Sequence, residues 1–257
     1  MMIIDLSSII GTHGTLNTDS QYNFLFSIVV PVFNEEKIIL DSLLKIKKFI
    51  SQNQDSNAIF VDDGSVDQTL YLINKNLGNN IFITSHVTNK GYGSALKTGI
   101  SYAKKLKSKY VVFLDSDMTN DLNDIYKFRK FMNLDFDIIK ATRYEGKFNE
   151  SKIPFKRFII SYIGNLIFKM IFRGKVTDAT NGFRAIKVKH YSNIMLYDDG
   201  FSIIVEELFK FKNFKKLKII NIHVKLGIRD TVIKKSSFTY DIKTIFSYIK
   251  YIMNFYS

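Results

Sequence analysis

The sequence contains no cysteine at all. This absence excludes disulfide bridges, thiolate metal ligands and cysteine nucleophiles. Long hydrophobic runs are also missing, because no window reaches the roughly 18 consecutive apolar residues that a membrane-spanning helix needs. The first 23 residues lack the basic start and apolar stretch of a secretory signal, so we expect a poorly ordered lead-in over residues 1–23.

Acidic side chains are far outnumbered by basic ones in the second half of the chain. Residues 129–257 carry 25 Lys and Arg against 11 Asp and Glu, a net charge of +14, whereas residues 1–128 have a net charge of −1. A basic half favours a polyanionic partner, which is nucleic acid, an anionic bilayer or a phosphorylated substrate. A lysine-rich solvated surface is the alternative explanation.

Short apolar runs alternate with helical patterns through the first 114 residues. The pattern predicts strands over 26–31, 58–61, 81–83 and 110–114, and helices over 35–50, 67–76 and 93–106. Strands that alternate with helices in this way indicate βαβ units and a parallel sheet covered on both faces. The length of 257 residues fits one large α/β domain or one domain with an appendage.

Polar residues collect where three of these strands end. The three loops are Asn34-Glu35-Glu36, Asp62-Asp63-Gly64-Ser65 and Asp115-Ser116-Asp117. Ligands of such sheets bind beyond the carboxyl ends of the strands, so three acidic loops there predict one site. Any one loop could instead cap a helix. An RNA-binding protein has no use for an acidic cluster, and we therefore expect no nucleic-acid partner.

Two segments suggest how phosphates are bound. Asp115 and Asp117 stand one residue apart, so on an extended stretch both carboxylates point to one side and suit Mg²⁺ or Mn²⁺. The glycine-rich segment 89–99 fails both the P-loop and the dinucleotide fingerprint, because Leu96 stands where each requires glycine. It remains a glycine-rich turn that opens a helix and offers backbone N–H groups to an anion.

Six motifs together carry a family resemblance. They are Pro31-Val-Phe-Asn-Glu35, Asp62-Asp-Gly-Ser-Val-Asp-Gln-Thr69, Asn89-Lys-Gly-Tyr-Gly-Ser-Ala95, Asp115-Ser-Asp117, Ala141-Thr-Arg-Tyr144 and Asp178-Ala-Thr-Asn-Gly-Phe-Arg184. In this order they resemble the inverting family 2 glycosyltransferases, above all the branch that makes dolichyl- or polyprenyl-phosphate sugars. The resemblance covers about residues 26–240. It implies a single GT-A-like (Rossmann-like) α/β domain over 24–240 with a mostly parallel central sheet. The helical spacing of apolar residues near the end of the sequence predicts a C-terminal amphipathic helix over 241–257.

The resemblance also implies roles for individual residues. The residues implied to bind the nucleotide are Pro31, Asn34, Glu35, Asp62, Asp63, Gly91 and Asp115. Among them, Asp63 is implied to contact the nucleotide base. The metal falls on Asp115 and Asp117, although Met118-Thr-Asn-Asp-Leu122 departs from the family pattern and leaves a third ligand open. Catalytic positions are Asp178, Arg143, Arg184 and Glu206. Phosphate binding falls on Arg157, Arg229 and Lys235, the last two in a segment that matches the family only loosely.

These assignments predict a metal-dependent enzyme that moves a sugar from a nucleotide-sugar donor to a dolichyl or undecaprenyl phosphate. The alternative is an enzyme of the same fold that extends a lipid-linked or cell-surface glycan at a hydroxyl. A phosphate acceptor needs no strong base, whereas a hydroxyl acceptor needs a carboxylate to take its proton. Asp178 and Glu206 are the candidates, and each could instead serve as a helix cap or in a salt bridge.

Two apolar segments bear on the membrane. Residues 240–256 place apolar side chains at helical spacing with lysines nearby, and residues 155–172 are apolar almost all round. Both could lie in a bilayer interface or pack on the sheet. With the charge of +14, they predict a cytoplasmic enzyme that binds peripherally to an anionic membrane surface.

Overall fold

The computed structural model describes residues 22–143, 172, 174–212 and 216–225. The predictions for Arg157, Arg229, Lys235, nearly all of 155–172 and the C-terminal helix over 241–257 therefore lie outside the described residues, as does almost all of the lead-in. Within the described ranges, no helix combines the length and hydropathy that crossing a bilayer requires.

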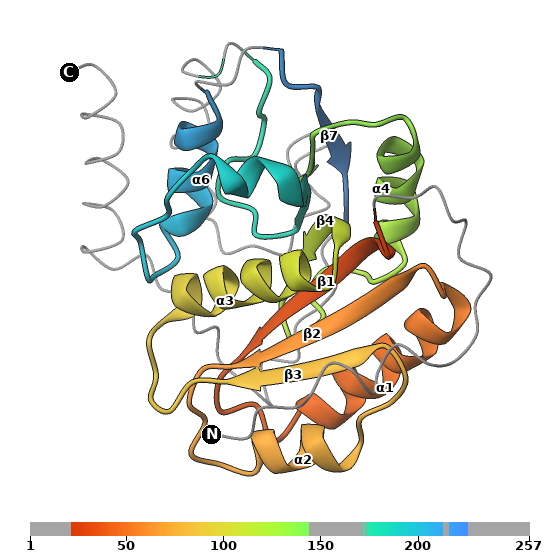
Figure 1. Ribbon diagram of the computed structural model, residues 1–257, viewed down its shortest axis with the longest axis vertical. Coiled ribbons are helices and arrows are strands. Elements are labelled where there is room, and N and C mark those ends of the chain that lie inside the picture. Colours follow the sequence, from red (N-terminus) through yellow and green to blue (C-terminus); the bar gives the residue numbers. More distant parts are fainter. Residues whose placement is uncertain (1–21, 144–171, 173, 213–215, 226–257) are drawn as a thin grey trace.

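Seven strands form one mixed sheet (Figure 1). They are β1 (Phe24–Val32), β2 (Ser56–Asp62), β3 (Ile81–Ser85), β4 (Ser108–Phe113), β5 (Ile138–Thr142), β6 (Arg184–Lys187) and β7 (Ile219–His223). Their order across the sheet is β3-β2-β1-β4-β6-β5-β7. β6 runs antiparallel to both of its neighbours, and the other described pairs are parallel. The predicted mostly parallel sheet is confirmed.

Helices cover both faces of this sheet. They are α1 (Ile39–Gln52), α2 (Thr69–Lys75), α3 (Tyr92–Lys105), α4 (Asp124–Asn133) and α6 (Ile203–Lys212), with a short 3₁₀ turn, η3, at Val188–Ser192. The predicted start of the first helix at Glu35 is wrong. The Glu35 carbonyl accepts from the backbone N–H groups of Ile38 and Ile39, which closes a turn before α1 begins.

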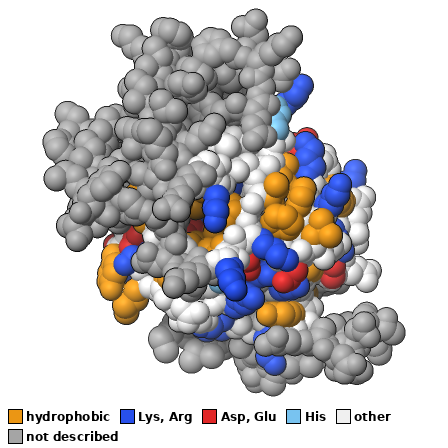
Figure 2. Space-filling model, turned by 90° about the horizontal axis from the view of Figure 1, so that it is seen from above, with side chains coloured by type: hydrophobic (Ala, Val, Ile, Leu, Met, Phe, Trp, Pro, Cys, Tyr) orange, Lys and Arg blue, Asp and Glu red, His pale blue; other side chains and the backbone are white. Residues whose placement is uncertain are grey.

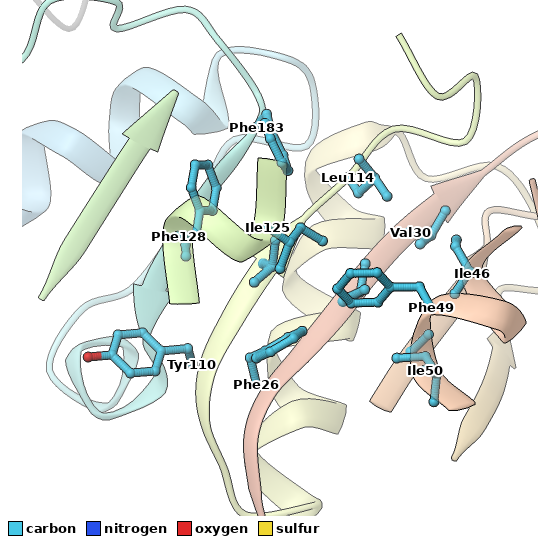
Figure 3. Close-up of a cluster of buried hydrophobic side chains, with 14 of the residues drawn as sticks. Phe26, Val30, Ile46, Phe49, Ile50, Tyr110, Leu114, Ile125, Phe128 and Phe183 are labelled. Atoms are coloured by element: carbon cyan, nitrogen blue, oxygen red, sulfur yellow. The ribbon is translucent and has the colours of Figure 1, made fainter. Parts of the chain in front are cut away.

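The alternation of side chains along β1 divides the core into two layers. Phe26, Ile28 and Val30 pack with residues of α1 and α4, whereas Val29 packs with residues of α3 on the opposite face. Figure 3 shows the first layer, in which Phe128 of α4 stacks on Phe183 with ring centroids 4.6 Å apart. Each such side chain contributes about 1.5–3 kcal/mol when fully buried. The loops at the carboxyl ends of the strands are thereby held on a rigid base.

Candidate functional site

The loops after β1, β2 and β4 are joined to one another. The Asn34 backbone N–H donates to Ser65 Oγ at 2.9 Å, and Asn34 Oδ1 accepts from the Val66 N–H at 2.9 Å. Ser116 Oγ donates to Glu35 Oε1 at 3.1 Å. The three acidic loops therefore form one connected unit at the carboxyl edge of the sheet, as the sequence predicts.

Asp115 and Asp117 lie in a turn, so the extended conformation expected for them is wrong. The Met118 N–H approaches the Asp115 carbonyl at 3.3 Å, and Met118 has a φ of 51°. The middle residue, Ser116, is buried and its carbonyl accepts from Ser42 Oγ of α1 at 2.6 Å. Anchoring the middle residue fixes the turn, while both aspartates keep partly exposed side chains.

The donor set of this turn fits a divalent cation that is shared with a substrate. In the part of the chain that the structure describes, no three Asp, Glu or His side chains gather closely enough to hold a metal alone. Mg²⁺ usually binds through one or two carboxylates and takes its other ligands from water and substrate phosphates. Asp115 and Asp117 supply two carboxylates of that kind on one short, well-anchored turn.

Asp63 binds the glycine-rich turn that precedes α3. The carboxylate is buried and accepts from His86 Nδ1 at 2.6 Å, the Lys90 N–H at 2.9 Å and the Gly91 N–H at 2.8 Å. The sequence predicts that this turn offers its N–H groups to a bound anion, and in the structure two of them bind the Asp63 carboxylate. Direct contact between Asp63 and a nucleotide base stays a prediction.

Four other residues that the sequence assigns to nucleotide binding lie at the same edge of the sheet. They differ in how deeply they are buried. Asp62 is buried, and its Oδ2 accepts from the Ser65 N–H at 3.2 Å. Pro31 is partly exposed in β1, and Asn34 is exposed with a φ of 53°. Glu35 is buried beneath the loop that it anchors. Asn34 is thus the most accessible of these four.

The glycine-rich turn is packed closely against residues 198–200. Gly91 has a φ of 98°, and a side chain there would clash with the carbonyl of Asp199. Gly93 donates its N–H to that carbonyl at 2.7 Å. The Asp199 carboxylate accepts from Lys97 Nζ at 2.6 Å and Ser94 Oγ at 2.5 Å, and these bonds lower its pKa.

Glu206 holds the same segment from α6. It is 1% exposed, and its carboxylate accepts from the backbone N–H groups of Tyr197 at 2.9 Å and Asp198 at 2.8 Å. These donors belong to the segment before α6 and not to its first turn, so Glu206 anchors this segment and does not cap the helix. Its predicted catalytic role has no support from this geometry.

Asp178 and Arg143 form a buried ion pair. Asp178 is 0% exposed and accepts from Arg143 Nε at 2.7 Å and Nη2 at 2.8 Å, a bidentate arrangement. Burial raises the pKa of Asp178, but the Arg143 guanidinium more than offsets this, so the pKa lies below its ordinary value. Arg143 keeps 18% of its side chain exposed, so the pair reaches the surface through its guanidinium side and not through the carboxylate.

Arg184 lies deeper and binds a residue that the sequence analysis missed. Its Nε donates to Glu207 Oε2 at 2.9 Å, and Nη2 donates to the same oxygen. Tyr191 also donates to Glu207, and Arg184 Nη1 donates to the Gly182 carbonyl at 2.7 Å. Arg184 and Glu207 are both 1% exposed, so the pair is enclosed by the core.

Two further residues of the site were missed by the sequence analysis. Tyr92 donates to Asp115 Oδ1 at 3.2 Å and stacks on Phe201, and burial and the charge of Asp115 raise its pKa well above the ordinary value. Lys140 of β5 is 0% exposed and donates to the Asn181 carbonyl at 2.6 Å. A lysine inside the otherwise uncharged strand IIKAT was the signal that could have identified Lys140.

Comparison with known proteins gives consistent findings. The family model described as glycosyl transferase family 2 matches residues 27–195. An uncharacterized protein of Methanocaldococcus jannaschii, MJ1222, is 31% identical over 65% of this chain and 67% of its own. A UDP-N-acetylglucosamine–dolichyl-phosphate N-acetylglucosaminyltransferase of Methanococcus voltae is 27% identical over 63% of this chain and 68% of its own.

A solved structure shows the same fold. Glucosyl-3-phosphoglycerate synthase from Mycobacterium tuberculosis superposes with a TM-score of 0.64 and 18% identity, over 90% of this chain and 80% of its own. That structure contains Mn²⁺, UDP and glucosyl-3-phosphoglycerate. The likeness confirms the GT-A-like architecture expected from the sequence.

Proposed function

Because the chain belongs to glycosyl transferase family 2, we propose that this glycosyltransferase moves a sugar from a nucleotide-sugar donor to a polyprenyl phosphate. The reaction uses Mg²⁺ or Mn²⁺ and takes place at the cytoplasmic face of a membrane. The name of the Methanococcus voltae relative, a dolichyl-phosphate transferase, supports the choice of acceptor.

One observation carries the choice between the two acceptor classes. Both carboxylates proposed as the base for a hydroxyl acceptor are buried and bound to internal donors. Asp178 is held by Arg143, and Glu206 is held by the backbone N–H groups of Tyr197 and Asp198. Asp178, whose pKa is lowered within its ion pair with Arg143, is poorly suited to remove a hydroxyl proton, and the Glu206 carboxylate is occupied by backbone donors. A phosphate acceptor is already an anion and requires no such step.

The residues of the site then divide the work. Asp115 and Asp117 hold the metal, which when bound stabilises negative charge on the leaving diphosphate. Tyr92 positions Asp115 through its hydroxyl, and Ser116 fixes the turn that carries both aspartates. Arg143, oriented by Asp178, holds phosphate oxygens at the partly exposed rim of the site.

The membrane part of the proposal rests on composition. The second half of the chain carries a charge of +14, and its two apolar segments lie at 155–172 and 240–256. Figure 2 shows Lys and Arg side chains interspersed with hydrophobic ones, and with a few acidic ones, on the described part of the upper face. Such a surface binds anionic bilayers by combining apolar insertion with attraction to headgroups.

The test compares two acceptors that differ only in the phosphate. Purified protein is incubated with a panel of nucleotide sugars and Mn²⁺, with either a polyprenyl phosphate or the corresponding polyprenol. We expect glycosylated product from the phosphate alone. Product from the polyprenol or from a soluble sugar, with none from the polyprenyl phosphate, would overturn the proposal and favour the glycan-extending enzyme.

A further inference from the structure

Lys140 is a fully buried cation that the proposed reaction leaves without a role. It lies in β5, directly opposite Arg184 of β6 in the sheet register. Its Nζ donates to the Asn181 carbonyl at 2.6 Å, and its side chain is 0% exposed. A lysine ammonium is costly to bury unless it is paired, so a position beside a second cation is an unfavourable place for it.

The residue that follows Asn181 connects Lys140 to the metal-binding turn. A Cβ placed on Gly182 would lie 3.2 Å from the Tyr92 hydroxyl and 3.8 Å from Asp115 Oδ2. Gly182 therefore borders the pair of groups that we place at the metal. The hydrogen bond from Lys140 to the Asn181 carbonyl fixes the peptide group between Asn181 and Gly182, next to Tyr92 and Asp115.

Four charged groups of the described residues act on Lys140. Arg184 of β6 and Arg143 beyond β5 are cations, whereas Asp178 and Glu207 of α6 are anions. With Lys140 protonated, these five groups sum to a charge of +1, and with Lys140 neutral the cluster is uncharged. Burial and the charge of Arg184 lower the pKa of Lys140 to about 7.

We propose that Lys140 is a positioning residue of the transferase site, and that its protonated form holds residues 181–182 in the arrangement that Tyr92 and Asp115 need. This inference rests on the proposed function. A charged donor binds a carbonyl more strongly than a neutral amine does. Protonation therefore tightens the contact, and loss of the proton loosens it without removing the side chain.

The first arm of the test is the pH dependence of kcat at saturating substrate. We expect the wild-type rate to fall about tenfold as pH rises through about 7, since one charge-assisted hydrogen bond is weakened. Lys140→Met should remain at the lower rate throughout, and Lys140→Arg, which does not titrate here, should remain at the higher rate. Any change that belongs to the acceptor phosphate is shared by all three proteins and cancels in their ratios.

Lys187→Met provides the matched control, because Lys187 is a second buried lysine on the adjacent strand β6. It should retain the wild-type fall in rate. A ratio of wild type to Lys140→Met that stays constant with pH would show a merely structural role and overturn the proposal. A ratio of wild type to Lys140→Arg that does not fall between pH 6 and 9 would also overturn it.

The second arm does not depend on activity. The folded pKa of Lys140 lies below the unfolded value of 10.5, so the unfolded state holds the proton across that interval and stability rises with pH. The melting temperature of wild type relative to Lys140→Met should therefore increase between pH 7 and pH 10. A constant difference would overturn the proposal. Absence of transfer to any acceptor, with this increase present, would contradict the proposed function instead.

Discussion

Two buried lysines on neighbouring strands, Lys187 and Lys140, differ in their binding partners and in the direction in which their pKa is shifted. Lys187 lies toward the amino ends of β4 and β5, where Nζ contacts Asp135 at 2.8 Å and Asp137 at 3.0 Å. Burial lowers its pKa, but these carboxylates outweigh burial and raise it. Lys140 lies toward the carboxyl ends, bound to a carbonyl and beside Arg184, and its pKa falls to about 7.

The comparison shows how one sheet serves two purposes. At the amino ends, the cation is matched by acids, and His190 Nε2 also contacts Asp137 at 2.9 Å, so that charge is satisfied inside the fold. Around Lys140, toward the carboxyl ends of β4 and β5, three cationic side chains face the two buried acids Asp178 and Glu207, and the metal-binding turn lies nearby. We therefore expect changes at the carboxyl ends to affect activity most, and changes at the amino ends to affect stability alone.

The largest effect should come from the metal-binding turn. Asp115→Ala and Asp117→Ala should each lower kcat/KM by a factor of at least about 10³, because the leaving diphosphate loses its electrostatic partner. Thermal unfolding should change little. Asp41→Ala, an exposed aspartate of α1, is the control and should keep wild-type activity. Full activity in excess EDTA would contradict the metal assignment.

Next in size is the buried pair of Arg184 and Glu207. Glu207→Gln leaves a guanidinium buried without its counter-charge, and we expect a loss of about 3–5 kcal/mol in the free energy of unfolding. Urea titration measures it. Glu206→Gln, one residue earlier, keeps an acceptor for the backbone N–H groups of Tyr197 and Asp198 and should cost less. Equal losses of unfolding free energy in the two variants would show that the ion pair of Arg184 and Glu207 contributes no more to stability than the bonds of Glu206.

Asp63→Asn should have an intermediate effect. Its carboxylate accepts from three donors, and an amide would turn an N–H group toward one of them. We expect the dissociation constant of the nucleotide-sugar donor to rise roughly tenfold as the glycine-rich turn loosens. Calorimetry measures it, with the exposed Asp41→Asn of α1 as control. An unchanged dissociation constant would contradict a role for Asp63 in binding the nucleotide-sugar donor.

The smallest effect belongs to the amino ends. Lys187 and Lys109 lower the pKa of Asp135 to about 2 from 3.8, so its contribution to stability is present above pH 4 and disappears as pH falls toward 2. Because Asp135 is 56% exposed, Asp135→Asn should cost less than about 1 kcal/mol at pH 7. Transferase activity should be unaffected, and a tenfold loss would contradict the division between the two ends.

Local patterns were sufficient to predict the strands of the first half and the acidic loops after them. Apolar runs such as FSIVVP form strands wherever they are buried, and their carboxyl ends meet because the strands are parallel. The pattern could not show that β6 is antiparallel or that Asp115 and Asp117 lie in a turn. Those features depend on contacts such as Ser42 with Ser116, 74 residues apart.

The choice between neighbouring acids was also beyond the sequence. Glu206 and Glu207 are adjacent, and successive residues of a helix point about 100° apart. One therefore faces the backbone at 197–198 and the other faces Arg184. Only the packing of α6 against the sheet decides which is which. The charge inside strand IIKAT marks Lys140 as unusual, but its partner is a backbone carbonyl, which the sequence does not identify.

The central claim is that the acceptor is a phosphate, and a competition experiment tests it most directly. The protein, its donor and Mn²⁺ are mixed with equal concentrations of a polyprenyl phosphate and a lipid-linked glycan that has free hydroxyls, and the products are identified by mass spectrometry. We predict a sugar joined to the polyprenyl phosphate through its phosphate oxygen, with the glycan unchanged. A lengthened glycan with unmodified polyprenyl phosphate would contradict the claim.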